Sequence, residues 1–208
     1  MKKVLSFSII LFFMLILTGC INKKELQEEL VNAINSSEQH IADLSKDGYL
    51  EDNVYYYPDL NIKFEIPDTL RILTNREINI LVYGATDQPS DDDNVLIYEL
   101  YALNMDDNSA ITLMSDTPAY DYSIDDYVSI FFNTISANSE EQNTTVSDPE
   151  ECEICGHNFI KIRSIINDRS RCVDVYIIKV DNKFVSIQIV SNSEEEALEY
   201  LSIIKPLE

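Results

Sequence analysis

Three apolar stretches follow one another in the last third of the chain, separated by only a few polar residues. They are Phe159 to Ile166, Arg171 to Val180 and Phe184 to Ser191. In the last stretch apolar and polar residues alternate, which is the period of a β-strand with one buried face. The intervening segments 167–170 and 181–183 carry Asp and Asn and are too short to hold a crossover helix. The three stretches are therefore predicted to form an antiparallel meander.

A second group of strands is predicted in the first half of the chain. Residues Leu60 to Ile66 alternate between apolar and polar side chains, and the pattern stops at Pro67. Further strands are predicted at Ile78 to Tyr83, Val95 to Leu103 and Ala110 to Met114. Because their connections are also too short for crossover helices, this half is predicted to be antiparallel as well.

Two helices are predicted to cover the sheet. Ser123 is a suitable N-cap for the first helix, and polar residues beyond Ala137, as far as Pro149, indicate a surface loop. Ser193 and Glu196 have the spacing of a capping box that starts the second. The predicted apolar faces consist of Ile124, Tyr127, Val128, Phe131 and Ile135 in the first helix, and of Leu198, Leu201, Ile203 and Ile204, up to Pro206, in the second. The predicted fold class is α+β, an antiparallel sheet flanked by helices.

The chain begins with the three zones of a secretory signal. Lys2 and Lys3 form a basic flank, Val4 to Leu17 is almost entirely apolar, and small residues follow. The apolar run is shorter than the roughly 20 residues of a membrane-spanning helix. Its end, Leu17-Thr18-Gly19-Cys20, resembles the lipobox of bacterial lipoproteins. The resemblance implies that Cys20 carries a diacylglyceryl group on its sulfur and becomes the mature N-terminus; the alternative is an ordinary cleaved signal in which Cys20 is incidental.

The signal and the lipobox-like segment divide the chain into three predicted parts. Residues 1–19 are the predicted lipoprotein signal peptide, and residues 20–53 are the predicted lipid anchor and a helical tether. Residues 54–208 are the predicted globular α+β domain. His40 lies within the tether and is expected to be solvated. The expected location is the extracytoplasmic face of the cell membrane, held there by lipid on Cys20.

The charge balance excludes one class of partner. The chain has 37 Asp and Glu against 15 Lys and Arg, with a formal net charge of −22. Binding to nucleic acid depends on Lys and Arg that release counterions from phosphates, so no nucleic-acid partner is expected. An anionic lipid surface is repelled as well, which leaves attachment to the lipid group. The abundance of Ile, Asn, Tyr and Asp beside four Gly indicates an AT-rich genome, as in low-GC Gram-positive bacteria.

The order of the predicted elements supports a second resemblance. At Leu60 to Pro67, at Ser123 to Ile135 and at Asn158 to Ile204, the chain resembles the PsbP/Mog1-like α/β/α sandwich, which recurs in small bacterial lipoproteins. Many relatives carry a tryptophan soon after the proline, whereas this chain has Asp68-Thr69-Leu70 there and no Trp at all. The resemblance implies a non-enzymatic domain that binds a partner protein or helps a complex assemble.

One short segment contains residues suited to chemistry. Cys152 and Cys155, in the pattern C-x-x-C, are followed by His157. The two thiols are compatible with a local disulfide, a redox pair or, with His157, a metal site. Redox chemistry is disfavoured because the pair precedes a strand instead of opening a helix. Zinc is disfavoured because the remaining candidate ligand, Cys172, is predicted opposite Ile165, far along the strand, and is expected to be a buried apolar residue.

The other candidates have plainer explanations. The acidic loop Asp87 to Asn94 offers oxygens for Ca²⁺ but lacks the spacing and the glycine of an EF-hand, so a solvated loop is favoured. The tyrosines at positions 55, 56, 57, 83, 98 and 101 fit strands, although interfaces are also rich in Tyr. We therefore predict no enzymatic activity and no cofactor. The main hypothesis is a lipid-anchored binding module for another cell-envelope protein or component, and the alternative is a thiol redox or metal-dependent function of Cys152, Cys155 and His157.

Overall fold

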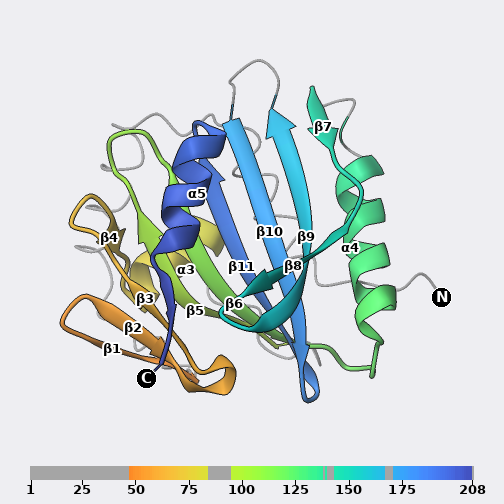
Figure 1. The fold of residues 1–208 in the computed structure, drawn as a ribbon, viewed down its shortest axis with the longest axis horizontal. Helices are drawn as coiled ribbons and strands as arrows, with labels where there is room; N and C mark the ends of the chain where they lie inside the picture. Colours follow the sequence, from red (N-terminus) through yellow and green to blue (C-terminus); the bar gives the residue numbers. More distant parts are fainter. Residues whose placement is uncertain (1–46, 84–94, 138, 140–142, 167–170, 208) are drawn as a thin grey trace.

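The computed structural model describes residues 47–83, 95–137, 139, 143–166 and 171–207 (Figure 1). The predicted signal peptide, Cys20, His40 and the acidic loop Asp87 to Asn94 lie outside the described residues. No helix within the described ranges is long and apolar enough to span a bilayer.

A large antiparallel sheet forms the centre of the molecule. Its strand order is β4-β5-β6-β11-β10-β9-β7, and β8 also pairs with β9. The predicted meander is confirmed as β9, β10 and β11, including the predicted pairing of Cys172 with Ile165. The strands are β4 (Arg71–Ile72), β5 (Val95–Leu103), β6 (Ala110–Thr117), β7 (Thr144–Val146), β8 (Glu150–Ile154), β9 (His157–Ile166), β10 (Arg171–Val180) and β11 (Lys183–Ser191).

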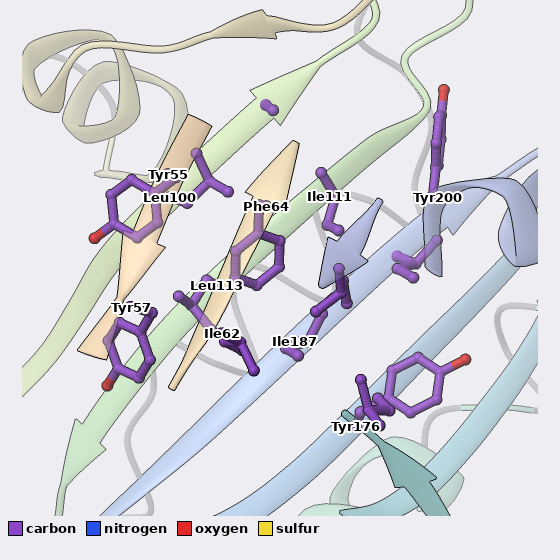
Figure 2. Close-up of a cluster of buried hydrophobic side chains, with 14 of the residues drawn as sticks. Tyr55, Tyr57, Ile62, Phe64, Leu100, Ile111, Leu113, Tyr176, Ile187 and Tyr200 are labelled. Atoms are coloured by element: carbon purple, nitrogen blue, oxygen red, sulfur yellow. The ribbon is translucent and has the colours of Figure 1, made fainter. Parts of the chain in front are cut away.

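A smaller antiparallel sheet covers part of one face of the large sheet. Its order is β1 (Tyr49–Glu51), β2 (Val54–Tyr57), β3 (Ile62–Glu65) and β12 (Ile204–Pro206), with the short 3-10 helix η1 (Pro58–Leu60) between β2 and β3. Figure 2 shows its inward side chains meeting those of the large sheet. The labelled residues of this core are Tyr55, Tyr57, Ile62 and Phe64 from the small sheet, Leu100, Ile111, Leu113, Tyr176 and Ile187 from the large sheet, and Tyr200 from a helix.

Three α-helices in the described part of the chain complete the cover of the large sheet. α5 (Glu194–Ser202) packs on β10 and β11, on the same face as the small sheet. α3 (Asn75–Tyr83) and α4 (Ile124–Ala137) contribute to the core on the opposite face, where the ring of Tyr127 stacks on Phe184 at 3.9 Å. The α+β class and the antiparallel sheet are confirmed. The architecture contains more sheet than an α/β/α sandwich, because one outer layer consists of the small sheet together with a single helix.

The segment Ile78 to Tyr83 is helical, so the strand predicted there is wrong. It forms most of α3, which a capping box starts. The Glu77 N–H donates to Thr74 Oγ1 at 3.3 Å, and Glu77 Oε2 accepts from the Thr74 N–H at 2.9 Å. These bonds satisfy backbone donors at the helix start, and they outweigh the β-propensity of a short apolar run.

The predicted C-terminal helix is confirmed at its start and wrong at its end. The Glu196 N–H donates to Ser193 Oγ at 3.1 Å, as expected of an N-cap. The helix ends at Ser202, and the segment Ile204–Pro206 forms β12 against β3. Leu198 is 59% exposed and not part of the buried face. Pairing with β3 buries Ile204 in the core and places Pro206 on an edge strand, where its missing N–H costs little.

Two predicted boundaries also differ from the structure. The expected surface loop between Ala137 and Pro149 contains β7, and β8 begins directly after it. The tether, predicted to extend to residue 53, includes β1, which pairs with β2 and therefore belongs to the folded part. Each strand has only three residues, too few to show an alternation; those of β1 are all exposed, and two of the three in β7 are half-buried.

We expect Thr74→Ala to lower the free energy of unfolding by about 1 kcal/mol, because the substitution removes the N-cap of α3. The measurement is urea-induced unfolding followed by circular dichroism. Thr69→Ala, at an exposed position of a nearby turn, is the matched control and should change stability little. An equal loss in both variants would show that the cap contributes nothing specific.

Candidate functional site

The three residues of the predicted thiol site lie on one β-hairpin. Cys152 is on β8 opposite Phe159 of β9, and Ile154 pairs with His157. Cys155 and Gly156 form the two-residue turn, with φ of 52° and 82°. Positive φ at both central positions is the mark of a type I′ turn, which matches the twist of a hairpin. The segment C-x-x-C-G-H is thus explained by hairpin geometry.

The hairpin separates the two thiols along extended backbone. Cys152 and Cys155 are three residues apart, and at about 3.3 Å per residue their Cα atoms are separated by roughly 10 Å if the chain stays extended. A disulfide requires Cα atoms closer than about 7 Å. Both cysteines are free thiols in the structure. A local disulfide or a dithiol redox pair would therefore require this hairpin to rearrange.

The environment of the thiols also disfavours thiolate chemistry. Burial raises the pKa of Cys152 and of Cys155 above the ordinary value, so less thiolate is present at neutral pH. The Cys155 Sγ lies 3.7 Å from the carbonyl oxygen of Ile204, which ties the hairpin tip to β12. Cys172 is buried, as predicted, and burial raises its pKa too. Across the described residues, no three His, Cys, Asp or Glu side chains are arranged to hold a metal ion.

A buried carboxyl group that the sequence analysis did not single out lies between the two sheets. Glu99 is the residue at the β-bulge of β5, and it is 0% exposed. Its Oε1 accepts from the Ser115 hydroxyl at 2.9 Å. Its Oε2 accepts from the Tyr55 hydroxyl and from the Asp47 N–H, both at 3.1 Å. Burial raises the pKa of Glu99, and the hydrogen bonds from Ser115 and Tyr55 offset part of that effect.

The same cluster fixes the beginning of the folded part. The Lys183 Nζ binds the carboxylate of Asp47 at 2.6 Å and also contacts the carboxylate of Asp59. Gly48 lies directly against the side chain of Tyr55, and a Cβ at this position would overlap the hydroxyl and the ring. Glycine is therefore needed here for close approach. Glu99 and Lys183 together hold the chain where it enters the small sheet.

Two further acids are buried on the large sheet. Asp174 is 1% exposed and accepts a bidentate pair from Arg163, at 2.7 and 2.8 Å, and Arg163 also binds Glu194 at the start of α5. Asp116 is 5% exposed and accepts from the Tyr127 hydroxyl at 2.8 Å. Burial raises the pKa of Asp116. Asp174 joins β10 to β9, whose Arg163 also contacts α5, and Asp116 joins β6 to α4.

These arrangements are suited to holding elements together. A general acid or base must reach a substrate proton, whereas Glu99, Asp116 and Asp174 are almost completely buried and face protein donors. The sequence contains one signal for them, a single acid inside an otherwise apolar strand. Glu99 stands within Val95–Leu103, and Asp174 stands between two valines. Such an acid is placed inward only when a partner satisfies it. The partner of Asp174 is Arg163 on the preceding strand, whereas Glu99 meets Tyr55, which is 44 residues away in the sequence.

Comparisons with known proteins found no related sequence and one weak structural similarity that is described here. No protein family model matches the chain, and no curated protein sequence matches it. Among solved structures, the chain is similar to cyanobacterial PsbP (CyanoP) from Synechocystis sp. PCC 6803, determined in solution. The TM-score is 0.43 at 9% identity, over 81% of this chain and 98% of that chain. This is a weak PsbP-like similarity.

We expect Glu99→Gln to fold and Glu99→Leu to lose about 3 kcal/mol or more in the free energy of unfolding. Gln keeps an oxygen for Tyr55 and the Asp47 N–H, while its amide can donate to Ser115. Leu leaves these three groups without their buried partner. Urea-induced unfolding at pH 7 measures both variants, and equal stability of Gln and Leu would contradict the assigned role.

The pH profile of the same variants tests the raised pKa of Glu99. A carboxyl whose pKa is higher in the folded than in the unfolded state stabilises the fold fully below the unfolded pKa of about 4.3, and the contribution is lost as pH rises through the folded pKa. The stability of the natural protein relative to Glu99→Gln should therefore fall as pH rises from about 4 towards neutral. A parallel pair of profiles would show that Glu99 does not titrate in this range.

Proposed function

We propose that this protein is a lipoprotein of the extracytoplasmic membrane face, anchored through Cys20, whose folded part is a non-catalytic binding or assembly domain. The anchor is supported by the basic flank, the apolar run and the lipobox-like Leu17-Thr18-Gly19-Cys20 in the expected order. The residues that follow Cys20 are the predicted tether, and the described residues begin at Asp47, which is held by Glu99. The resemblance of the sequence to PsbP/Mog1-like domains, which implies a domain that binds a partner protein or helps a complex assemble, supports the binding role.

The buried carboxyl groups support the non-catalytic part of the proposal, because they bind side chains within the protein. Glu99, Asp116 and Asp174 each accept hydrogen bonds from side chains of neighbouring elements and are sealed from solvent. By contrast, large side chains with exposed surface occur at the periphery, among them Tyr49 and Tyr120. Exposed aromatic side chains are typical of recognition surfaces.

Replacing Cys20 by Ser tests the anchor. We expect the variant to leave the membrane fraction, because two acyl chains supply the attachment and the acidic body of the protein does not. Mass spectrometry of the natural protein should find a mature chain that begins at Cys20 and carries acyl groups. An intact Met1, or equal membrane association of Cys20→Ser, would refute the anchor.

Replacing Cys152 and Cys155 together by Ser tests the thiol and metal alternative. Because both positions are explained by the hairpin, we expect unchanged metal content and at most a small loss of stability. Crosslinking in intact cells should recover the same envelope partner with the natural protein and with this double variant. A variant that loses metal or partner would favour the alternative, and failure to recover any reproducible partner would count against the binding role.

A further inference from the structure

The small sheet has one protected edge and one unprotected edge. β12, at one edge, includes Pro206, which has no N–H, and the carbonyl oxygen of Ile204 lies 3.7 Å from the Cys155 thiol. β1, at the other edge, contains neither Pro nor Lys, and among the described residues it pairs with β2 alone (Figure 1). Natural sheets use Pro, Lys or a covering segment to stop further pairing at an edge. The edge of β1 is therefore open to another strand.

The hairpin after β1 determines which backbone groups face this edge. Asp52 and Asn53 have φ of 46° and 63°, as in the type I′ turn of a two-residue hairpin, so Glu51 exchanges hydrogen bonds with β2. In an antiparallel ladder, hydrogen-bonded pairs alternate with pairs that are not hydrogen-bonded. The N–H and C=O of Leu50, the preceding residue, therefore point away from β2.

The pairing on the other side of β2 agrees with this assignment. The Ile66 N–H donates to the carbonyl oxygen of Asn53 at 3.0 Å, so by alternation Tyr55 exchanges hydrogen bonds with Phe64 of β3. The backbone groups of Tyr55 thus face β3 and not β1. Leu50, which is opposite Tyr55, has no partner for its N–H and C=O among the strands of this sheet.

The side chains of β1 leave apolar and aromatic surface in water. In the described part of the chain, two of the five exposed large hydrophobic residues are neighbours on β1, namely Tyr49 and Leu50, which are 53% and 51% exposed. Leu50 is in register with the buried Tyr55, so it points to the inner side of the small sheet. Tyr49 and Glu51 point to the outer side, because neighbouring residues on a strand alternate. β1 thus has an apolar inner side and an aromatic and acidic outer side.

The charge around β1 selects the sign of a partner. Glu51 and Asp52 are both exposed at the end of the strand, and the whole chain has a net charge of −22. Lys63 is two strands away and forms an ion pair with Glu65 at 2.9 Å, and Lys205 is on β12 at the opposite edge. An acidic partner would be repelled, whereas a basic one is attracted by the local and by the overall charge.

We propose that β1 binds an extended basic segment of a partner protein as an additional strand of the small sheet. The N–H and C=O of Leu50 pair with the backbone of the segment, which is the main-chain contact of strand addition. An apolar residue of the segment covers Leu50 on the inner side. Basic residues on either side of it meet Tyr49 and Glu51 on the outer side, by a cation–π contact and a cross-strand ion pair. The expected pattern is basic-apolar-basic. This inference rests on the proposed function, since it names the chemical class of the partner.

The test measures binding of a labelled peptide of alternating Lys and Val, blocked at both ends, to the full-length protein in detergent micelles by fluorescence anisotropy. We expect affinity to fall about tenfold for Leu50→Pro, which removes the N–H at the free edge, where Pro is tolerated. Leu50→Val keeps the N–H and should retain binding. Glu51→Gln should weaken binding about threefold, whereas Glu195→Gln, the matched loss of an exposed charge on α5, should not. Thermal unfolding checks that every variant is folded.

Two comparison peptides separate strand addition from attraction between charges. A peptide N-methylated at Val, the residues expected opposite Leu50, keeps the charge but cannot donate to the edge. A peptide of alternating Glu and Val keeps the strand pattern with the opposite charge. Each should bind at least about tenfold more weakly than the Lys and Val peptide. Equal binding of either peptide, unchanged affinity of Leu50→Pro, or an equal loss with Glu195→Gln would overturn the inference.

Sedimentation of the micellar protein alone tests a second copy as the occupant of β1. We expect no dimer that depends on β1, because two copies of this acidic chain repel one another. A dimer that Leu50→Pro dissociates would overturn the inference in favour of pairing between two copies. The anchor is tested by Cys20→Ser and the binding role by crosslinking in cells, so failure of peptide binding is distinguishable from failure of the proposed function.

Discussion

The large sheet is apolar on both faces, and the rest of the fold follows from this constraint. An antiparallel sheet can leave one face in water, but this one places buried side chains on each side of β6, β10 and β11. Two covering layers are therefore required. Helices α3 and α4 cover one face, and the small sheet with α5 covers the other. Because β12 follows α5 directly, the end of the chain completes the second layer.

The buried acids are consistent with this construction. A carboxyl group between packed layers loses its hydration, and the loss is tolerated only when protein donors replace water. Glu99, Asp116 and Asp174 each meet that requirement with a partner from another element. Asp116 and Asp174 link consecutive elements, β6 with α4 and β9 with β10, whereas Glu99 links the large sheet to the small sheet, which is distant in sequence. Burying each carboxyl group costs desolvation free energy that an apolar pair would not cost.

Local patterns in the sequence predicted the elements whose own residues determine their structure. Apolar runs separated by short turns with Asp and Asn are sufficient to predict β9 to β11, and caps with apolar spacing are sufficient for α4 and for the start of α5. The apolar run Ile78 to Tyr83 by itself indicates a strand, whereas the capping pair Thr74 and Glu77 just before it starts a helix. Ile204–Pro206 and Tyr49–Glu51 are strands because of their pairing partners, and pairing between distant segments leaves no mark in a short window.

The same distinction separates the two candidate sites. Cys152, Cys155 and His157 stood out because they are close in sequence, but the hairpin places them along extended backbone where turn geometry accounts for them. The cluster around Glu99 is not visible in the sequence because its members come from residues 47, 55, 99 and 115, and only the packing of the two sheets brings them together. The same holds for the C-terminal segment, whose contribution to the core depends on the pairing of β12 with β3, which buries Ile204.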